Sequence, residues 1–195
     1  MSEANGRPLR IMFHDEARFG RIDDPRRCWA PFPYRPLVHA AVVQEFTYAY
    51  AAVSPQDGVL DSLILPSVGT AMMDLFLGEV SVRHPDEFIV MIMDGAGWHT
   101  SRELHLPHNM RILYLPPYSP ELNPVEYLWD EIREKYFPNR VFATIESLEV
   151  HLMHSLATLE QDAERVKNIA GWDWIINAIL NQNIPRSFAA RMPFL

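Results

Sequence analysis

The chain has 195 residues, of which 48% are hydrophobic, and this predicts one globular domain rather than a disordered or fibrous protein. Its net charge of −8 argues against a module that holds nucleic acid by electrostatic attraction alone, and its single cysteine excludes an internal disulfide. No apolar run is long enough to cross a membrane and the N-terminus lacks an apolar signal core, so we expect a soluble, cytoplasmic protein.

The first third of the chain has the pattern of an antiparallel meander. Segments rich in β-branched and aromatic residues predict three strands, over residues 10–19, 37–53 and 59–65. The turn Ser54-Pro55-Gln56-Asp57-Gly58 separates the last two of them. Three neighbouring strands at this spacing suggest a meander, in which neighbours pair antiparallel.

The remainder of the chain alternates helical and strand patterns. Apolar spacing predicts a helix over 70–82, a buried strand over 88–93, a short helix over 101–106 and a strand over 110–115. Helices are then expected over 124–136, 144–164 and 166–180. Strand-helix-strand order indicates parallel pairing. The prediction is an α/β fold in which a three-strand meander is followed by parallel strands in one mixed sheet, with helices on both faces.

Two acidic residues lie where predicted strands approach their carboxyl ends. Asp15 is near the end of the first strand, and Asp94 directly follows the strand over 88–93. In sheets with parallel strands, chemistry gathers at these ends. Because side chains alternate along a strand, Asp15 and Glu16 point to opposite faces, and we assign Asp15 to the site with Asp94.

A third acid, Glu126, follows a proline-rich loop over residues 115–124. Prolines restrict the loop, and Asn123 is the predicted N-cap of the next helix, so Glu126 lies on its first turn. Glu126 lies off the apolar stripe of this helix. It could serve only as the acid of a capping box with Asn123, but the presence of Asp15 and Asp94 favours a site role.

Three converging carboxylates predict a hard oxygen site for Mg²⁺ or Mn²⁺. Two such ions can activate a water or hydroxyl on one side of a phosphodiester and stabilise the leaving oxygen on the other. Enzymes that cleave phosphate esters lower the barrier by on the order of 20 kcal/mol, more than side-chain acid-base catalysis supplies. The predicted chemistry is therefore metal-dependent phosphoryl transfer.

One stretch of the chain has a local excess of basic residues. Its five arginines are Arg18, Arg21, Arg26, Arg27 and Arg35. These side chains are candidates for contact with DNA backbone phosphates near the site. The alternative is a solvated hairpin whose charges face water.

Three motifs occur in the order typical of a known family: Phe13-His14-Asp15-Glu16-Ala17-Arg18-Phe19-Gly20, Met93-Asp94-Gly95-Ala96-Gly97-Trp98-His99, and the segment from Leu115 to Trp129 with Asn123-Pro124-Val125-Glu126. The chain resembles the catalytic domain of DDE transposases of the mariner-like superfamily, in particular the bacterial insertion-sequence branch. The resemblance covers nearly the whole chain and implies a single ribonuclease-H-like domain over residues 1–195. It implies Mg²⁺-dependent cleavage and strand transfer at transposon ends.

The resemblance also implies roles for particular residues. Asp15, Asp94 and Glu126 match the metal ligands of the family. His99 matches a position that leans towards the scissile phosphate or orients a ligand, and a hydrogen-bonded structural histidine is the alternative. Where many relatives have asparagine after the second aspartate, this chain has Gly95.

Further expectations concern partners. The implied partner is DNA, both transposon ends and target, with a homodimer as the active complex. Relatives carry an N-terminal helix-turn-helix, whereas this chain begins about ten residues before its first predicted strand. Either a separate chain supplies that DNA-binding region, or this chain is a truncated remnant. The alternative function is a non-catalytic remnant or regulator that pairs with a full-length transposase.

Overall fold

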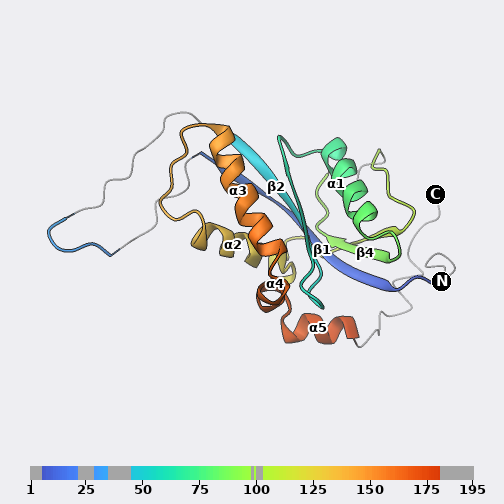
Figure 1. The fold of residues 1–195 in the computed structure, drawn as a ribbon. Helices are drawn as coiled ribbons and strands as arrows, with labels where there is room; N and C mark the ends of the chain where they lie inside the picture. Colours follow the sequence, from blue (N-terminus) through green and yellow to red (C-terminus); the bar gives the residue numbers. More distant parts are fainter. Residues whose placement is uncertain (1–5, 22–28, 35–44, 98, 100–102, 181–195) are drawn as a thin grey trace.

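A single mixed sheet of five strands forms the centre of the protein (Figure 1). The computed structural model describes residues 6–21, 29–34, 45–97, 99 and 103–180. The strands are β1 (Leu9–Gly20), β2 (Phe46–Val53), β3 (Leu60–Leu65), β4 (Phe88–Met93) and β5 (Met110–Tyr114). Their order across the sheet is β3-β2-β1-β4-β5, which places β1 at the centre.

Pairing in the sheet follows the predicted pattern. β1, β2 and β3 are antiparallel neighbours, whereas β1, β4 and β5 run parallel. The parallel register of β1 and β4 ends where Phe13 pairs with Ile92. Asp94 follows two residues later, directly after β4. Asp15 also follows two residues later but lies inside β1, which continues to Gly20 and does not end near Asp15 as predicted. Both acids lie just beyond the point where the parallel pairing ends.

Helices cover both faces of the sheet, and they too confirm the prediction (Figure 1). They are α1 (Thr70–Arg83), α2 (Val125–Lys135), α3 (Ile145–Glu160), α4 (Ala163–Ala170) and α5 (Asp173–Leu180). The alternation of side chains along β1 serves two cores. Phe13 and Ala17 pack with residues of α2, α3 and α4, whereas Met12 packs on the other face with Phe76 of α1.

Two predicted helical stretches are broken in the structure. The helix expected over 144–164 ends at Glu160, because the Asp162 side chain accepts a hydrogen bond from the Arg165 N–H (3.1 Å) and caps α4. The helix expected over 166–180 is divided between α4 and α5 at Gly171. The same apolar residues are buried, but on three shorter helices instead of two.

Two further segments differ from expectation or lie partly outside the described residues. Residues 103–106 form a turn and extended chain where a helix was predicted. There the His105 N–H donates to the Asp74 carboxylate of α1 (2.7 Å), and Leu104 packs against the core below it. These contacts with α1 take the place of local helical hydrogen bonds. Residues 37–44 of the second predicted strand are outside the described part of the chain.

Among the residues that the structure describes, none of the helices has the length and apolarity needed to span a membrane.

Ion pairs link neighbouring elements at the end of the sheet where β1 begins. Arg10 of β1, for example, pairs with Asp57 (2.9 Å) and with Glu87. The predicted site lies at the opposite end of the parallel strands, beyond the last paired residues of β1 and β4.

Candidate metal centre at the carboxyl ends of the central strands

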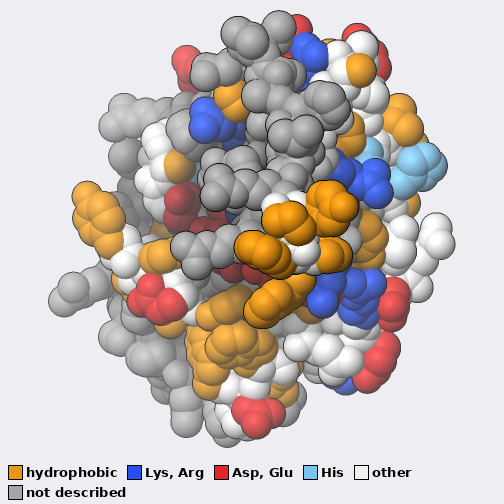
Figure 2. All heavy atoms as spheres, turned by 90° about the vertical axis from the view of Figure 1, so that its left-hand side faces the viewer, with side chains coloured by type: hydrophobic (Ala, Val, Ile, Leu, Met, Phe, Trp, Pro, Cys, Tyr) orange, Lys and Arg blue, Asp and Glu red, His pale blue; other side chains and the backbone are white. Residues whose placement is uncertain are grey.

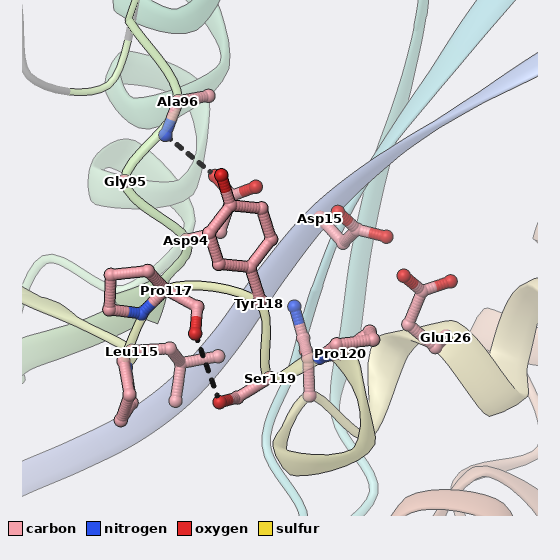
Figure 3. A pocket seen from close by; sticks show the side chains of 12 residues that line it. Asp15, Asp94, Gly95, Ala96, Leu115, Pro117, Tyr118, Ser119, Pro120 and Glu126 are labelled. Carbon is pink, nitrogen blue, oxygen red and sulfur yellow. Dashed lines mark hydrogen bonds between the residues drawn. The ribbon is translucent and has the colours of Figure 1, made fainter.

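One pocket is lined by all three acids that the sequence analysis assigned to a site (Figure 3). Asp15 comes from β1, Asp94 from the turn after β4, and Glu126 from the first turn of α2. The cavity has a volume of about 460 Å³ and is closed on one side by the loop from Leu115 to Pro120. We call it the carboxylate pocket.

Asp15 is held by the sheet and by a tryptophan. Its backbone is paired with Ala51 of β2, and its Oδ2 accepts a hydrogen bond from Trp129 Nε1 (2.9 Å). Burial, together with the nearby charge of Glu126, raises the pKa of Asp15 to about 7. In the absence of a cation, this carboxylate is therefore only partly ionised near neutral pH.

Asp94 is the most open of the three acids, with 60% of its side chain exposed. Its Oδ1 nonetheless accepts two hydrogen bonds, from the Ala96 N–H (3.0 Å) and from His99 Nδ1 (2.7 Å). Figure 3 shows Asp94 across the pocket from Asp15 and Glu126, which lie near each other. The second oxygen of Asp94 is thus the one more available to a ligand.

Asn123 fixes the position from which Glu126 enters the pocket. Its Nδ2 donates to the backbone carbonyl of His14 in β1 (2.9 Å), and its Oδ1 accepts from the Val125 N–H (3.2 Å). The Asn123 N–H donates to the Pro120 carbonyl (2.9 Å), so it is not the partner of a capping-box acid. The described contacts favour the site interpretation of Glu126 over the capping box, and α2 begins at Val125, one residue later than predicted.

The charges of the three acids oppose one another. Burial raises the pKa of Glu126, Asp130 and Asp94 add to the effect, and Arg133 works against it. Carboxylates that are held this way release their protons readily only when a cation offsets their repulsion. An all-oxygen donor set of this kind fits Mg²⁺ or Mn²⁺.

The predicted arginines fall into three groups. Arg18 is exposed, with its guanidinium 4.5 Å from the ring centroid of Phe46. Arg21 is engaged within the protein, because it pairs with Glu45 (2.7 Å) and donates to the carbonyls of Phe142 (3.1 Å) and Ala143. The remaining three, Arg26, Arg27 and Arg35, lie outside the described residues.

His99 lies beside Asp94, as the sequence analysis considered, but it also contacts a residue that the analysis set aside. Its Nε2 is 2.9 Å from Glu16 Oε1, and the side chain is 1% exposed. Burial opposes ionisation of Glu16, but His14 and His99 lower its pKa well below the usual range. Burial likewise opposes protonation of His99, but Glu16 and Asp94 raise the pKa of His99 overall.

Two supporting residues of the site were not predicted. The indole N–H of Trp129 was not considered as a partner for Asp15. Glu16 was placed correctly on the face opposite Asp15, but its link to Asp94 through His99 depends on how the turn after β4 folds back. The sequence signal available for that link was a histidine five residues after Asp94.

The surface has the charge distribution that such a site needs. On the face that is turned to the left in Figure 1, Figure 2 shows acidic side chains in a recess, with hydrophobic side chains gathered beside them and Lys and Arg side chains elsewhere on the face. Recessed acids repel a phosphate backbone unless a cation lies between them. This distribution is therefore consistent with a cation-dependent site.

Comparisons with known families and with curated proteins each give a match. The family model described as "DDE superfamily endonuclease" matches residues 10–149. The protein "Uncharacterized protein y4pE/y4sA" of Sinorhizobium fredii (strain NBRC 101917 / NGR234) is 34% identical over 131 residues, which are 66% of this chain and 96% of that protein.

Solved structures of the Mos1 transposase share the fold. The paired-end complex with left transposon end has a TM-score of 0.58 at 18% identity and covers 83% of this chain and 55% of that one. The pre-cleavage Mos1 transpososome has a TM-score of 0.59 at 16% identity, covering 84% and 56%. The paired-end complex with Mn has a TM-score of 0.59 at 17% identity, covering 82% and 53%. This chain thus spans about half the length of the solved transposases that it matches.

Proposed function

The chain belongs to the DDE superfamily endonucleases, and from this membership we propose that it is a transposase catalytic domain that cleaves DNA phosphodiester bonds and transfers the cut strand. The observation that carries the proposal is the convergence of Asp15, Asp94 and Glu126 on one pocket. The metal ligands would be these three carboxylates, and the ions Mg²⁺ or Mn²⁺, two in number.

When bound, two such ions supply an activated water or hydroxyl and a stabilised leaving oxygen. The protein supplies the positions of the ligands. Trp129 orients Asp15, and the Ala96 N–H with His99 orients Asp94. Asn123 ties the start of α2 to β1 and so sets the reach of Glu126. Preorganised ligands of this kind are the main contribution of a protein to metal-ion catalysis.

DNA is the proposed substrate, both as transposon ends and as target. Support comes from the solved Mos1 structures, which are described as a paired-end complex with the left transposon end and a Strand Transfer Complex. The net charge of −8 provides little attraction for DNA, so we propose that a separate DNA-binding region supplies most of the affinity. Joining two ends further suggests a homodimer as the active complex, and Arg18 is placed to contact the backbone.

A nicking assay tests the proposal. Supercoiled plasmid is incubated with the chain in Mn²⁺, and the parent is compared with Asp94→Asn and Glu126→Gln. We expect each variant to lose more than about 100-fold in nicking rate, because a metal ligand is removed while the size of the side chain is kept. Asp86→Asn, which neutralises an exposed acid in the turn before β4, serves as control and should nick like the parent.

The outcome that contradicts the assignment is equally defined. If the parent nicks above a protein-free control and Asp94→Asn and Glu126→Gln nick as fast as the parent, these acids do not hold the catalytic ions. If none of the three proteins nicks above the protein-free control, the alternative of a non-catalytic regulator is favoured.

A further inference from the structure

Behind Asp94 lies a second, more tightly clustered group of ligand atoms. His14, Glu16 and His99 each offer one atom, and these atoms lie within 4.8 Å of one another. Among the described residues, no other group of three histidines, cysteines or acids brings its ligand atoms this close together. The side chains are 0%, 8% and 1% exposed, respectively. We call this group the imidazole site.

The proton on His14 can be assigned from its partner. His14 Nδ1 is 2.8 Å from the backbone carbonyl of Ala51, which can only accept a hydrogen bond. Nδ1 therefore carries the hydrogen, and in the neutral ring Nε2 presents a lone pair. That Nε2 is buried without a hydrogen-bond partner and lies 3.5 Å from Glu16 Oε1, longer than an N–H···O hydrogen bond.

The same assignment holds for His99. Its Nδ1 is 2.7 Å from Asp94 Oδ1 and 3.1 Å from the Asp94 carbonyl, and both of these oxygens are acceptors. Nδ1 therefore donates to Asp94, and Nε2, 2.9 Å from Glu16 Oε1, carries a proton only when the ring is charged, a proton that a bound metal ion would displace. Without that proton, two ring nitrogens and a carboxylate oxygen face one another in a buried space, where they can serve as ligands.

We propose that His14, Glu16 and His99 bind a first-row divalent transition metal ion, for which Zn²⁺ is the best match, at a site distinct from the carboxylate pocket. Imidazole nitrogen suits such ions, whereas Mg²⁺ prefers oxygen. Ligand atoms about 2.0–2.2 Å from a zinc ion stand roughly 2.8–3.6 Å apart in tetrahedral or octahedral geometry. The two separations from Glu16, 2.9 and 3.5 Å, match that range.

The outer partners of the two histidines match those of metal ligands. A histidine that binds a metal commonly donates its other ring N–H to a backbone carbonyl or to a carboxylate, which fixes the ring. His14 does the first with Ala51, and His99 does the second with Asp94. Two separate observations therefore support the proposal: the clustering of the three ligand atoms, and the hydrogen bonds that hold the two imidazole rings.

The position of the site gives it a structural consequence. It connects β1, through His14 and Glu16, with the turn after β4 that carries Asp94 and His99. An ion there would hold His99 and, through it, the orientation of Asp94 towards the carboxylate pocket. This goes beyond the proposed DNA cleavage and does not depend on it, since the ion binds without DNA.

Zinc titration without DNA tests the inference. The background is the double variant Asp15→Asn/Glu126→Gln, in which the carboxylate pocket is disabled. Calorimetry should show one Zn²⁺ per chain, and X-ray absorption at the zinc edge should show imidazole ligands. Because the ion binds the folded chain, Zn²⁺ should also raise the thermal midpoint.

His14→Asn in this background is the decisive variant. Its amide can still donate to the Ala51 carbonyl, but the Nε2 ligand is absent. We expect affinity for Zn²⁺ to fall more than about 100-fold, beyond the loss typical for an outer partner. His105→Asn is the matched control, since His105 is exposed and pairs with Asp74 (3.0 Å), and it should bind like its parent.

Glu16→Gln provides a second variant, to be used if His14→Asn does not fold without metal. The inference is overturned if Zn²⁺ does not bind the double variant, if it binds through oxygen ligands alone, or if both His14→Asn and Glu16→Gln retain the affinity. The cluster would then be balanced by protons on the imidazoles. Failure of plasmid nicking does not bear on this result, because no step of the test involves DNA cleavage.

Discussion

The environment of Asp15 differs strongly from that of an ordinary, solvated aspartate. Burial and the charge of Glu126 raise its pKa to about 7, and the hydrogen bond from Trp129 reduces the effect only in part. In this environment the charged form of the Asp15 carboxylate is destabilised unless a cation lies beside it. A metal ion stabilises the charged form by binding it, so protons and metal ions compete for Asp15.

This competition predicts a pH dependence for metal binding. Below about pH 7 the proton on Asp15 must be displaced, so the affinity for Mn²⁺ should rise from pH 6 to pH 8 by about tenfold or less. The same pKa has the opposite effect on the metal-free fold. The folded state holds the proton more tightly than the unfolded state, so the contribution of Asp15 to stability is present near pH 4 and is lost as pH rises through about 7.

Urea unfolding in a chelator measures the second effect. The free energy of unfolding of the parent relative to Asp15→Asn should fall as pH rises from about 4 to about 7, and near pH 7 the variant should be the more stable by on the order of 1 kcal/mol or more. Asp86→Asn should follow the parent throughout. A difference between parent and Asp15→Asn that stays constant over this range would show that the pKa of Asp15 is not raised.

At the scale of elements, the approach of α2 to β1 decides whether the site assembles. Asn123 makes this contact, since its side chain bonds both the His14 carbonyl of β1 and the first N–H of the helix. The side chain is 4% exposed, so neither bond is readily replaced by water. Asn123 therefore sets both the position of α2 and the position of Glu126 on its first turn.

Asn123→Ala should accordingly weaken both the fold and the site. The loss of two buried hydrogen bonds should cost about 2–4 kcal/mol of unfolding free energy, and Mn²⁺ affinity should fall because Glu126 is no longer fixed. Chemical denaturation and metal titration measure the two effects. Ser119→Ala, in the same loop, removes only a long 3.4 Å contact with the Pro117 carbonyl and should change neither. An unchanged Mn²⁺ affinity in Asn123→Ala would separate the helix contact from the site.

The elements also show how far the sequence alone could lead. The β-rich segments of the first third of the chain and the apolar run of β4 were sufficient to predict the strands and their antiparallel and parallel pairing. The break at Asp162 was hidden because apolar spacing continues through it, and the extended residues 103–106 depend on contacts with α1. Long-range contacts of this kind leave no periodic signal.

The site was predicted in the same uneven way. Asp15, Asp94 and Glu126 were chosen because each follows a recognisable local pattern, and the structure places all three in the lining of one pocket. The contact of Glu16 with His99 was not found, because the two residues are 83 positions apart and belong to different elements. Glu16 does point to the face opposite Asp15, as predicted, but His99 connects it to Asp94.

At the scale of the whole molecule, the carboxylate pocket depends on the entire fold. β1, β4 and α2 come from different parts of the chain, and two separate cores hold the sheet between its helices. A net charge of −8 and recessed acids leave the domain poorly matched to DNA without cations (Figure 2). Metal binding is thus the property on which the proposed function of the whole molecule depends.

The measurement that tests this most directly is Mn²⁺ titration calorimetry of the parent beside Asp15→Asn, Glu126→Gln and the control Asp86→Asn. We expect saturable binding in the parent and the control, and loss of the same binding event in both site variants by more than about tenfold. The imidazole site is intact in all four proteins and does not obscure the comparison. Equal Mn²⁺ affinity and stoichiometry in all four would contradict a metal centre built from these carboxylates.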